Sequence, residues 1–211
     1  MGMPVLLTGR SGSGKTRSLK FFGDDEILLV NIEGKTLPFR KTFKYVCKTD
    51  DIDKIIQQLN KMPCKTAVID DAGYLMTHHF MKNHRNKKGN ASFDMYDDIA
   101  DMMYSLVKRV KDDTPDDVIV YIIMHEDVDD YGNIKPLTLG KLLDNKVNLC
   151  GMVTIALRCI SENKRHFFRV TTAGNDFIKS PEEMFEGDEM DNNLKEVDTK
   201  IREFYGWNKE A

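Results

Sequence analysis

Short apolar runs alternate along the chain with stretches in which apolar residues recur at helical spacing. Five of these runs predict buried strands, at residues 5–7, 27–32, 66–71, 118–124 and 152–158. A sixth strand at 166–172 follows the fifth through a polar turn, which is typical of an antiparallel hairpin at a sheet edge. Residues 45–47 are a candidate for one more short strand.

Helical patterns connect the predicted strands. A helix over 52–59 has Asp50 or Asp51 as its N-cap, and the most periodic helix begins at Ser92 as N-cap and runs to Val110. Further helices are expected just after residue 16 and at 72–81, 141–148 and 194–204. Strands that alternate with helices predict an α/β fold, with a mostly parallel central sheet flanked by helices and an antiparallel edge.

The domain organisation follows from the same pattern. A length of 211 residues fits one domain with a small appendage. The alternating strands and helices occupy residues 1–174, which we expect to form the core. Residues 175–211 are acidic and irregular apart from one amphipathic helix, so we expect them to form a C-terminal extension.

The most specific motif lies between the first strand and the helix after it. Its spacing, Gly-x-x-x-x-Gly-Lys-Thr over residues 9–16, is that of the phosphate-binding P-loop. The backbone N–H groups of such a loop surround phosphate oxygens, Lys15 reaches the β- and γ-phosphates, and the Thr16 hydroxyl ligates Mg²⁺. The residues expected to bind the nucleotide are Gly9, Arg10, Ser11, Gly12, Ser13, Gly14, Lys15, Thr16 and Arg17.

Polar residues follow three other predicted strands, where sites form in parallel sheets. Asp70 is expected to hold Mg²⁺ with Thr16, or else to act with Asp71 as a helix N-cap. Glu33 is the stronger candidate for activating water, and Asp71 is the alternative. His125 is either a sensor of the γ-phosphate or an ordinary histidine at the end of a strand.

Composition narrows the choice of partner. A hydrophobic fraction of 41% and a charged fraction of 31% fit a globular protein, and no apolar run approaches the ~20 residues that span a bilayer. We therefore expect no membrane partner. The four cysteines have no paired metal spacing, which favours reduced thiols in a cytoplasmic protein. A net charge of −3 leaves any binding of nucleic acid to local patches.

The layout of the motifs resembles the ATPase core of RecA-type recombinases. The P-loop, Glu33 after the second strand, Asp70 after the third and a polar residue at the end of the fourth carry the resemblance, although recombinases usually have glutamine in place of His125. With Glu33-Gly34, Lys135-Pro136 and Gly140-Lys141 added, residues 3–172 resemble a family of phage-encoded P-loop nucleotide-binding proteins. Some relatives in that wider group are single-strand annealing ATPases.

The resemblance implies a Mg²⁺-dependent ATPase that acts in DNA recombination, single-strand annealing or replication, in the host cytoplasm. The two loops that contact DNA in recombinases correspond to residues 82–92 and 126–140, although a solvated surface loop is the alternative for the first and acidic residues open the second. The candidate DNA contacts are Lys82, Arg85, Lys87, Lys88, Lys135 and Lys141.

Recombinase filaments also suggest a homo-oligomer whose neighbouring subunit supplies a cation to the ATP. Candidate donors are Lys141, Lys146, Arg158 and Arg165. Two other functions stay open at this point. One is a kinase for a small molecule such as a nucleoside or nucleotide, and the other is a binding module that nucleotide switches without hydrolysis.

Overall fold

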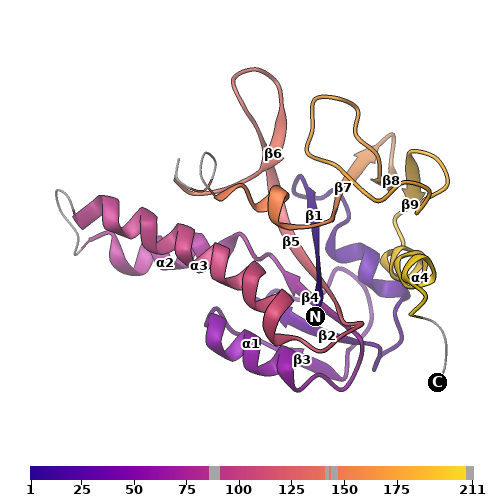
Figure 1. The fold of residues 1–211 in the computed structure, drawn as a ribbon, viewed down its shortest axis with the longest axis horizontal. Helices are drawn as coiled ribbons and strands as arrows, with labels where there is room; N and C mark the ends of the chain where they lie inside the picture. The colour runs from indigo at the N-terminus through magenta and orange to yellow at the C-terminus, as the bar shows by residue number, and fades with distance from the viewer. Residues whose placement is uncertain (86–90, 141–142, 144–146, 208–211) are drawn as a thin grey trace.

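A mostly parallel β-sheet forms the centre of the molecule (Figure 1). The computed structural model describes residues 1–85, 91–140, 143 and 147–207, without the side chains of 91–93. The strands are β1 (Met3–Gly9), β2 (Ile27–Asn31), β3 (Tyr45–Cys47), β4 (Thr66–Asp70), β5 (Ile119–Val128), β6 (Ile134–Pro136), β7 (Ile155–Glu162), β8 (Arg165–Arg169) and β9 (Glu189–Asp191). Their order is β3-β2-β4-β5-β1-β7-β8-β9, with β6 paired to β5. The predicted α/β fold is confirmed.

The helices lie on both faces of the sheet. They are the 3₁₀-helix η1 (Thr16–Phe21), α1 (Ile52–Asn60), α2 (Tyr74–Asn83), α3 (Ala91–Asp113), the 3₁₀-helix η3 (Leu149–Met152) and α4 (Leu194–Tyr205). Side chains of β1 alternate between two cores: Leu6 packs with α1, α2 and α3, whereas Val5 and Leu7 pack with η1 and α4. None of these helices is long and apolar enough to cross a bilayer, as far as the described residues go.

The register of the parallel strands brings several polar residues to one edge. Gly9 at the end of β1 pairs with His125 of β5, and Asn31 at the end of β2 pairs with Asp70 of β4. Strand β5 separates β1 from β4, so His125 lies between the P-loop and Asp70. The carboxyl ends of these strands therefore form one continuous polar edge.

Strand β5 is longer than its apolar run predicts. It was expected to end at His125, but it continues to Val128 because β6 pairs with residues 126–128 in an antiparallel hairpin. The hairpin projects beyond the body of the sheet in Figure 1. At its turn, the Asp129 carboxylate accepts hydrogen bonds from the N–H groups of Tyr131 and Asn133. Much of the expected acidic loop is therefore regular structure.

Several other boundaries differ from the predictions. Ser92 lies inside α3 and is not its N-cap, whereas Asp51 caps α1 by accepting from the N–H groups of Asp53 and Lys54. The segment after the P-loop is a 3₁₀-helix, residues 152–154 precede β7, and β8 ends at Arg169. The predicted hairpin of β7 and β8 is confirmed, although β9 forms the edge beyond it. Most of the expected helix at 141–148 lies outside the described residues.

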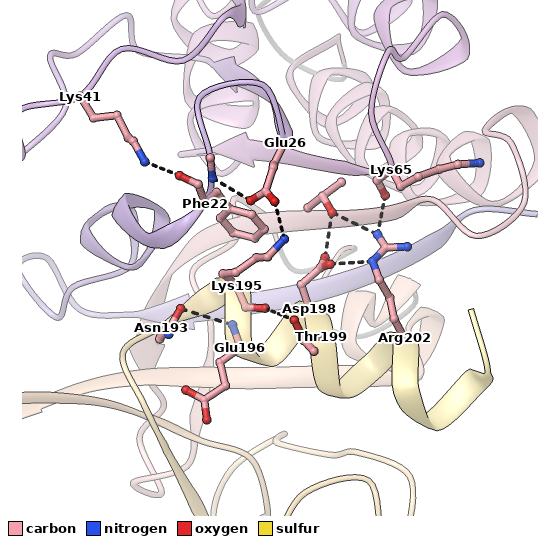
Figure 2. Close-up of polar contacts among 12 residues, drawn as sticks. Phe22, Glu26, Lys41, Lys65, Asn193, Lys195, Glu196, Asp198, Thr199 and Arg202 are labelled. Carbon is pink, nitrogen blue, oxygen red and sulfur yellow. Dashed lines mark hydrogen bonds and ion pairs between the residues drawn. The ribbon is translucent and has the colours of Figure 1, made fainter. Parts of the chain in front are cut away.

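The C-terminal residues complete the sheet and one of its cores. Strand β9 pairs with β8, and three apolar side chains of α4 are fully buried against the second core. Figure 2 shows the polar contacts that hold α4 in place, including those of Asp198 and Arg202. The acidic segment thus lies directly against the elements that carry the P-loop.

Candidate nucleotide-binding site

Backbone carbonyls of the P-loop accept hydrogen bonds from the side chain of Lys15. Gly12 and Gly14 have φ values of 76° and 106°, a left-handed conformation that favours glycine. The Lys15 ammonium donates to the carbonyls of Gly9 at 2.8 Å and Arg10 at 2.9 Å, and burial lowers its pKa. Lys15 is thus held at the centre of the loop, next to the groups that would receive phosphate.

Close packing at the start of the loop explains why Gly9 has no side chain. A Cβ atom at this position would lie 2.5 Å from the carbonyl oxygen of Cys159 and 2.5 Å from Ser13 Oγ. Both distances are too short for any side chain. The loop is therefore pressed against β7 on its outer side, which leaves its inner side open to a ligand.

Thr16 and Asp70 form the pair that a magnesium site requires. The Thr16 hydroxyl lies 3.1 Å and 3.0 Å from the two carboxylate oxygens of Asp70, to which it donates. Burial, together with the charge of Asp71, raises the pKa of Asp70 to about 6. A buried carboxylate beside a hydroxyl gives the hard oxygen ligands that Mg²⁺ prefers, and a cation relieves the cost of its negative charge. The donor set fits the ion.

Asp71 and His125 continue this polar edge next to Lys15. His125 Nδ1 lies 3.4 Å from Lys15 Nζ, and His125 Nε2 lies 3.5 Å from Asp71 Oδ1. Because an ammonium can only donate, Nδ1 accepts and the ring proton is on Nε2, facing Asp71. The His125 and Lys35 contacts lower the pKa of Asp71 to about 2, although burial opposes them. Asp71 does not cap α2, whose N-cap is Gly73.

A cavity of about 660 Å³ opens above these residues. Its polar part is the P-loop with Asp70, Asp71 and His125, and its apolar part comes from Leu37, Pro38, Tyr74 and Leu137. Lys35 lies across the Tyr74 ring, 4.8 Å from the centroid, while its ammonium pairs with Asp71 at 2.8 Å. The cavity thus joins an anion-binding end to an apolar wall.

Glu33 lies apart from this group. Its carboxylate is 2.7 Å from His78 Nε2, and the other ring nitrogen of His78 is 3.0 Å from Asp50. Glu33 does not line the cavity. Since β2 ends at Asn31, the next residues turn away and His78 on α2 binds the glutamate. The structure thus brings Lys15, Thr16, Asp70, Asp71 and His125 together and leaves Glu33 outside.

The two arginines of the P-loop segment differ in position. The Arg10 side chain is 72% exposed, and its Nε lies 3.6 Å from Glu126. Arg17 lines the cavity and donates to the side-chain oxygen of Asn192 at 2.8 Å. Ser11 and Gly12 also line the cavity, whereas Ser13 is buried.

Most of the candidate DNA-binding residues are either paired with another residue of the chain or lie outside the described residues. Lys82 Nζ lies 2.6 Å from Asp50, Arg85 is exposed, and Lys135 pairs in register with Asp127 across the hairpin. Lys87, Lys88 and Lys141 lie outside the described residues. Among the proposed cation donors, Arg158 makes two hydrogen bonds of 2.8 Å to Glu126 and Arg165 lies 3.1 Å from Glu189, while Lys146 is also outside.

The residues around the site that sequence reasoning missed include four with polar or aromatic side chains. Lys35 and Tyr74 line the cavity, His166 contacts Ser13 O at 2.7 Å, and Asn192 contacts Gly14 O at 3.2 Å. Only Lys35 carries a sequence signal, because it follows the Glu33-Gly34 turn at the end of a strand. The other three reach the site through tertiary packing, which has no local pattern.

Comparison with known proteins adds one finding. A family model described as an AAA domain matches residues 1–186. The match includes the P-loop, Asp70, Asp71 and His125, and it ends before β9. No curated protein matches the chain. The family match therefore covers the whole polar edge of the sheet and all the residues that line the cavity.

Proposed function

The chain belongs to the AAA domain family, and from that premise we propose that it is a Mg²⁺-dependent ATPase with a RecA-like P-loop core. The observation that supports this most directly is the contact of Thr16 with Asp70, beside Lys15 and at the base of one cavity. In P-loop NTPases, a hydroxyl of the P-loop and an aspartate at the end of a neighbouring strand hold the Mg²⁺ that accompanies the nucleotide, and Thr16 and Asp70 match this pair.

Each residue of the site has a role in this proposal. The N–H groups of the P-loop bind the β- and γ-phosphates, and Lys15 turns from its own backbone carbonyls toward the phosphate oxygens. Thr16 and Asp70 would hold Mg²⁺, which when bound would neutralise the charge that develops on the phosphoryl oxygens. His125 lies between Lys15 and Asp71, so we expect its contacts to change when the γ-phosphate is lost.

We assign the positioning of the attacking water to Asp71. Phosphoryl transfer has a loose transition state, so the water needs orientation more than a strong base. Asp71 lines the cavity next to Asp70, and its low pKa suits an acceptor that orients water without keeping the proton. Glu33, which the sequence favours for this role, is held by His78 instead.

Two isosteric substitutions test the assignment. Asp71→Asn should lower kcat for ATP hydrolysis about a hundredfold with little change in ATP affinity. The reason is that the asparagine amide has one oxygen that accepts hydrogen bonds from water, whereas the carboxylate has two. Glu33→Gln is the matched control and should keep kcat within about twofold. Steady-state hydrolysis and equilibrium ATP binding are measured for both. The reverse result, with loss in Glu33→Gln alone, returns the role to Glu33.

We extend the proposal to single-stranded DNA as the partner, in recombination, annealing or replication of the phage type. The resemblance to recombinases and the exposed Arg85 within the basic segment 82–88 support it. Lys82 contributes less than its sequence suggests, since Asp50 neutralises it. The oligomer that recombinases form is part of the same proposal.

A second candidate, a kinase for a small molecule, is supported by the apolar wall of the cavity. The side chains of Leu37, Pro38 and Leu137 offer no hydrogen bond to phosphates, so this wall has room for an acceptor next to Asp71. One assay separates the alternatives. Phosphate release that single-stranded DNA stimulates supports the recombinase-like ATPase, and phosphoryl transfer to a nucleoside supports the kinase. Tight ATP binding without turnover supports a nucleotide-switched binding module.

A further inference from the structure

One asparagine beyond the family match reaches back to the P-loop. Asn192 follows β9, and only 3% of its surface is exposed. Its side-chain nitrogen donates to the Gly14 carbonyl at 3.2 Å and to Cys159 Sγ at 3.3 Å. Its oxygen accepts from Arg17 at 2.8 Å. Both N–H bonds and the oxygen of the amide are therefore used, and two of the three contacts are to the P-loop segment.

The contact with Gly14 orients a phosphate-binding group. A trans peptide places its C=O and N–H on opposite sides, so a carbonyl held from the outer side of the loop turns the next N–H inward. Asn192 and the N–H of Ser18 both hold the Gly14 carbonyl, which turns the Lys15 N–H toward the cavity. His166 and Cys159 hold the Ser13 carbonyl in the same way, at 2.7 Å and 3.2 Å.

The packing at Gly14 is equally close. A Cβ atom there would lie 3.1 Å and 3.2 Å from the amide oxygen and nitrogen of Asn192, and 3.0 Å from His166 Nδ1. The Asn192 amide thus occupies the space next to the loop in which a side chain would otherwise lie. A shift of Asn192 by even a fraction of an ångström moves the Gly14 peptide with it.

Helix α4 fixes Asn192 from the other side. Lys195 Nζ lies 2.9 Å from Glu26, and the Asp198 carboxylate accepts from the Thr66 hydroxyl at 2.9 Å and from Arg202 Nε at 2.7 Å. Figure 2 shows the contacts of Lys195 with Glu26 and of Asp198 with Arg202. These contacts join the helix to the loop before β2 and to the start of β4. With β9 paired to β8, the backbone on both sides of Asn192 is anchored.

We propose that Asn192 is a positioning residue for nucleotide binding, which sets the Gly14 peptide and the Arg17 guanidinium in the geometry that receives phosphate. Residues 187–207, outside the family match, are then part of the nucleotide site and not an appendage to it. The inference rests on the proposed function in one respect, because it takes the P-loop as a site for ATP.

The test compares two neighbouring asparagines. Asn192→Ala should raise the Kd for Mg²⁺-ATP about tenfold, because it removes the bonds to Gly14 and Arg17 together. Asn193→Ala is the matched control: Asn193 caps α4 by accepting from the Glu196 N–H at 3.3 Å, as Figure 2 shows. Its loss should lower the melting temperature of the free protein by a few degrees and leave the Kd unchanged. Calorimetric titration and thermal melts give the two readouts.

A third variant keeps the shape of the side chain. Asn192→Asp still accepts from Arg17 but cannot donate to Gly14, and it places a negative charge beside the phosphates, so its Kd should rise more than that of Asn192→Ala. Asn192→Asp also provides the measurement of Kd if Asn192→Ala does not fold. An unchanged Kd in either Asn192 variant overturns the inference while ATP binding by the wild type upholds the ATP site. A wild type that binds no ATP overturns both.

Discussion

At the scale of single residues, two adjacent aspartates have opposite electrostatic surroundings. Burial raises the pKa of Asp70 to about 6, and the contacts with His125 and Lys35 lower the pKa of Asp71 to about 2. A left-handed backbone at Asp71, with φ of 61°, turns the two carboxylates in different directions. One acid therefore meets Thr16, and the other meets the cationic and imidazole groups of the cavity wall.

The raised pKa of Asp70 predicts how stability depends on pH. An unfolded chain releases this proton near pH 4, whereas the folded, ligand-free protein holds it to about pH 6. The folded state binds more protons between these values, so stability falls as pH rises through them and the cost is complete above pH 6. Asp70→Asn removes the cost, and we expect its free energy of unfolding at pH 8 to exceed that of the wild type by roughly 3 kcal/mol.

Urea denaturation at pH 4 and pH 8 checks this expectation. The difference between Asp70→Asn and the wild type should shrink at pH 4 to a small fraction of its value at pH 8, because the folded carboxyl is then protonated and only part of the unfolded carboxyls have lost their proton. Mg²⁺-dependent ATP affinity of the wild type should weaken as pH falls below about 6, since the proton and the ion compete for Asp70. A stability gain of equal size at both pH values would contradict the explanation.

The sequence predicts those site residues that a fixed spacing defines. The P-loop and Asp70 belong to local patterns, a glycine turn after a strand and an acid at the end of an apolar run. The partner of Glu33 could not be predicted, because His78 reaches it from another helix. Asn192 is 178 residues from Gly14 along the chain, and no spacing rule connects such positions.

At the scale of elements, apolar runs predict the long strands and the short strand β3, but they do not predict β6 and β9. Strands β6 and β9 have three residues each, too few to establish an alternating pattern. They exist because β5 and β8 offer edges to pair with. The same pairing extends β5 past His125. Pairing between distant segments thus sets the boundaries that local composition leaves undefined.

Helix α4 gives a prediction at this scale. Asp198 is buried, with 4% of its side chain exposed, and burial raises its pKa while Arg202 opposes the shift. Arg202 also donates to the carbonyls of Asp117 and Lys65. Arg202→Ala leaves a buried carboxylate without its cation, so we expect a loss of about 3–5 kcal/mol in the free energy of unfolding.

A second cation on the same helix is the control. Lys200 lies 3.6 Å from Glu203 with both side chains substantially exposed, and Lys200→Ala should cost less than about 1 kcal/mol. Chemical denaturation measures both variants. Equal losses of unfolding free energy in the two variants would mean that the contacts of Arg202 with Asp198, Asp117 and Lys65 do not stabilise the protein.

At the scale of the whole molecule, net charge opposes the proposed DNA partner. With a charge of −3, the protein repels a polyanion at long range, so binding depends on the basic segment between α2 and α3. Reversing Lys87 and Lys88 to glutamate should therefore weaken binding of single-stranded DNA at low salt at least about tenfold. Fluorescence anisotropy of a labelled oligonucleotide over a range of salt concentrations measures it.

The matched control reverses two exposed lysines elsewhere. Lys48 and Lys61 lie at the two ends of the segment around α1, and their double reversal changes the net charge by the same amount. Its affinity should fall only slightly. If both double variants lose affinity equally, the effect comes from net charge and the basic segment has no specific role.

The contact of Asn192 with the P-loop also sets an order in time. The ribosome makes the phosphate-binding motif before the side chain that orients its Gly14 peptide, which is 178 residues further along the chain. At 5–20 residues per second, roughly ten to forty seconds separate the two. During that interval, the nascent chain carries the loop without the Asn192 contact to Gly14. The geometry of the P-loop is thus completed well after the motif itself is translated.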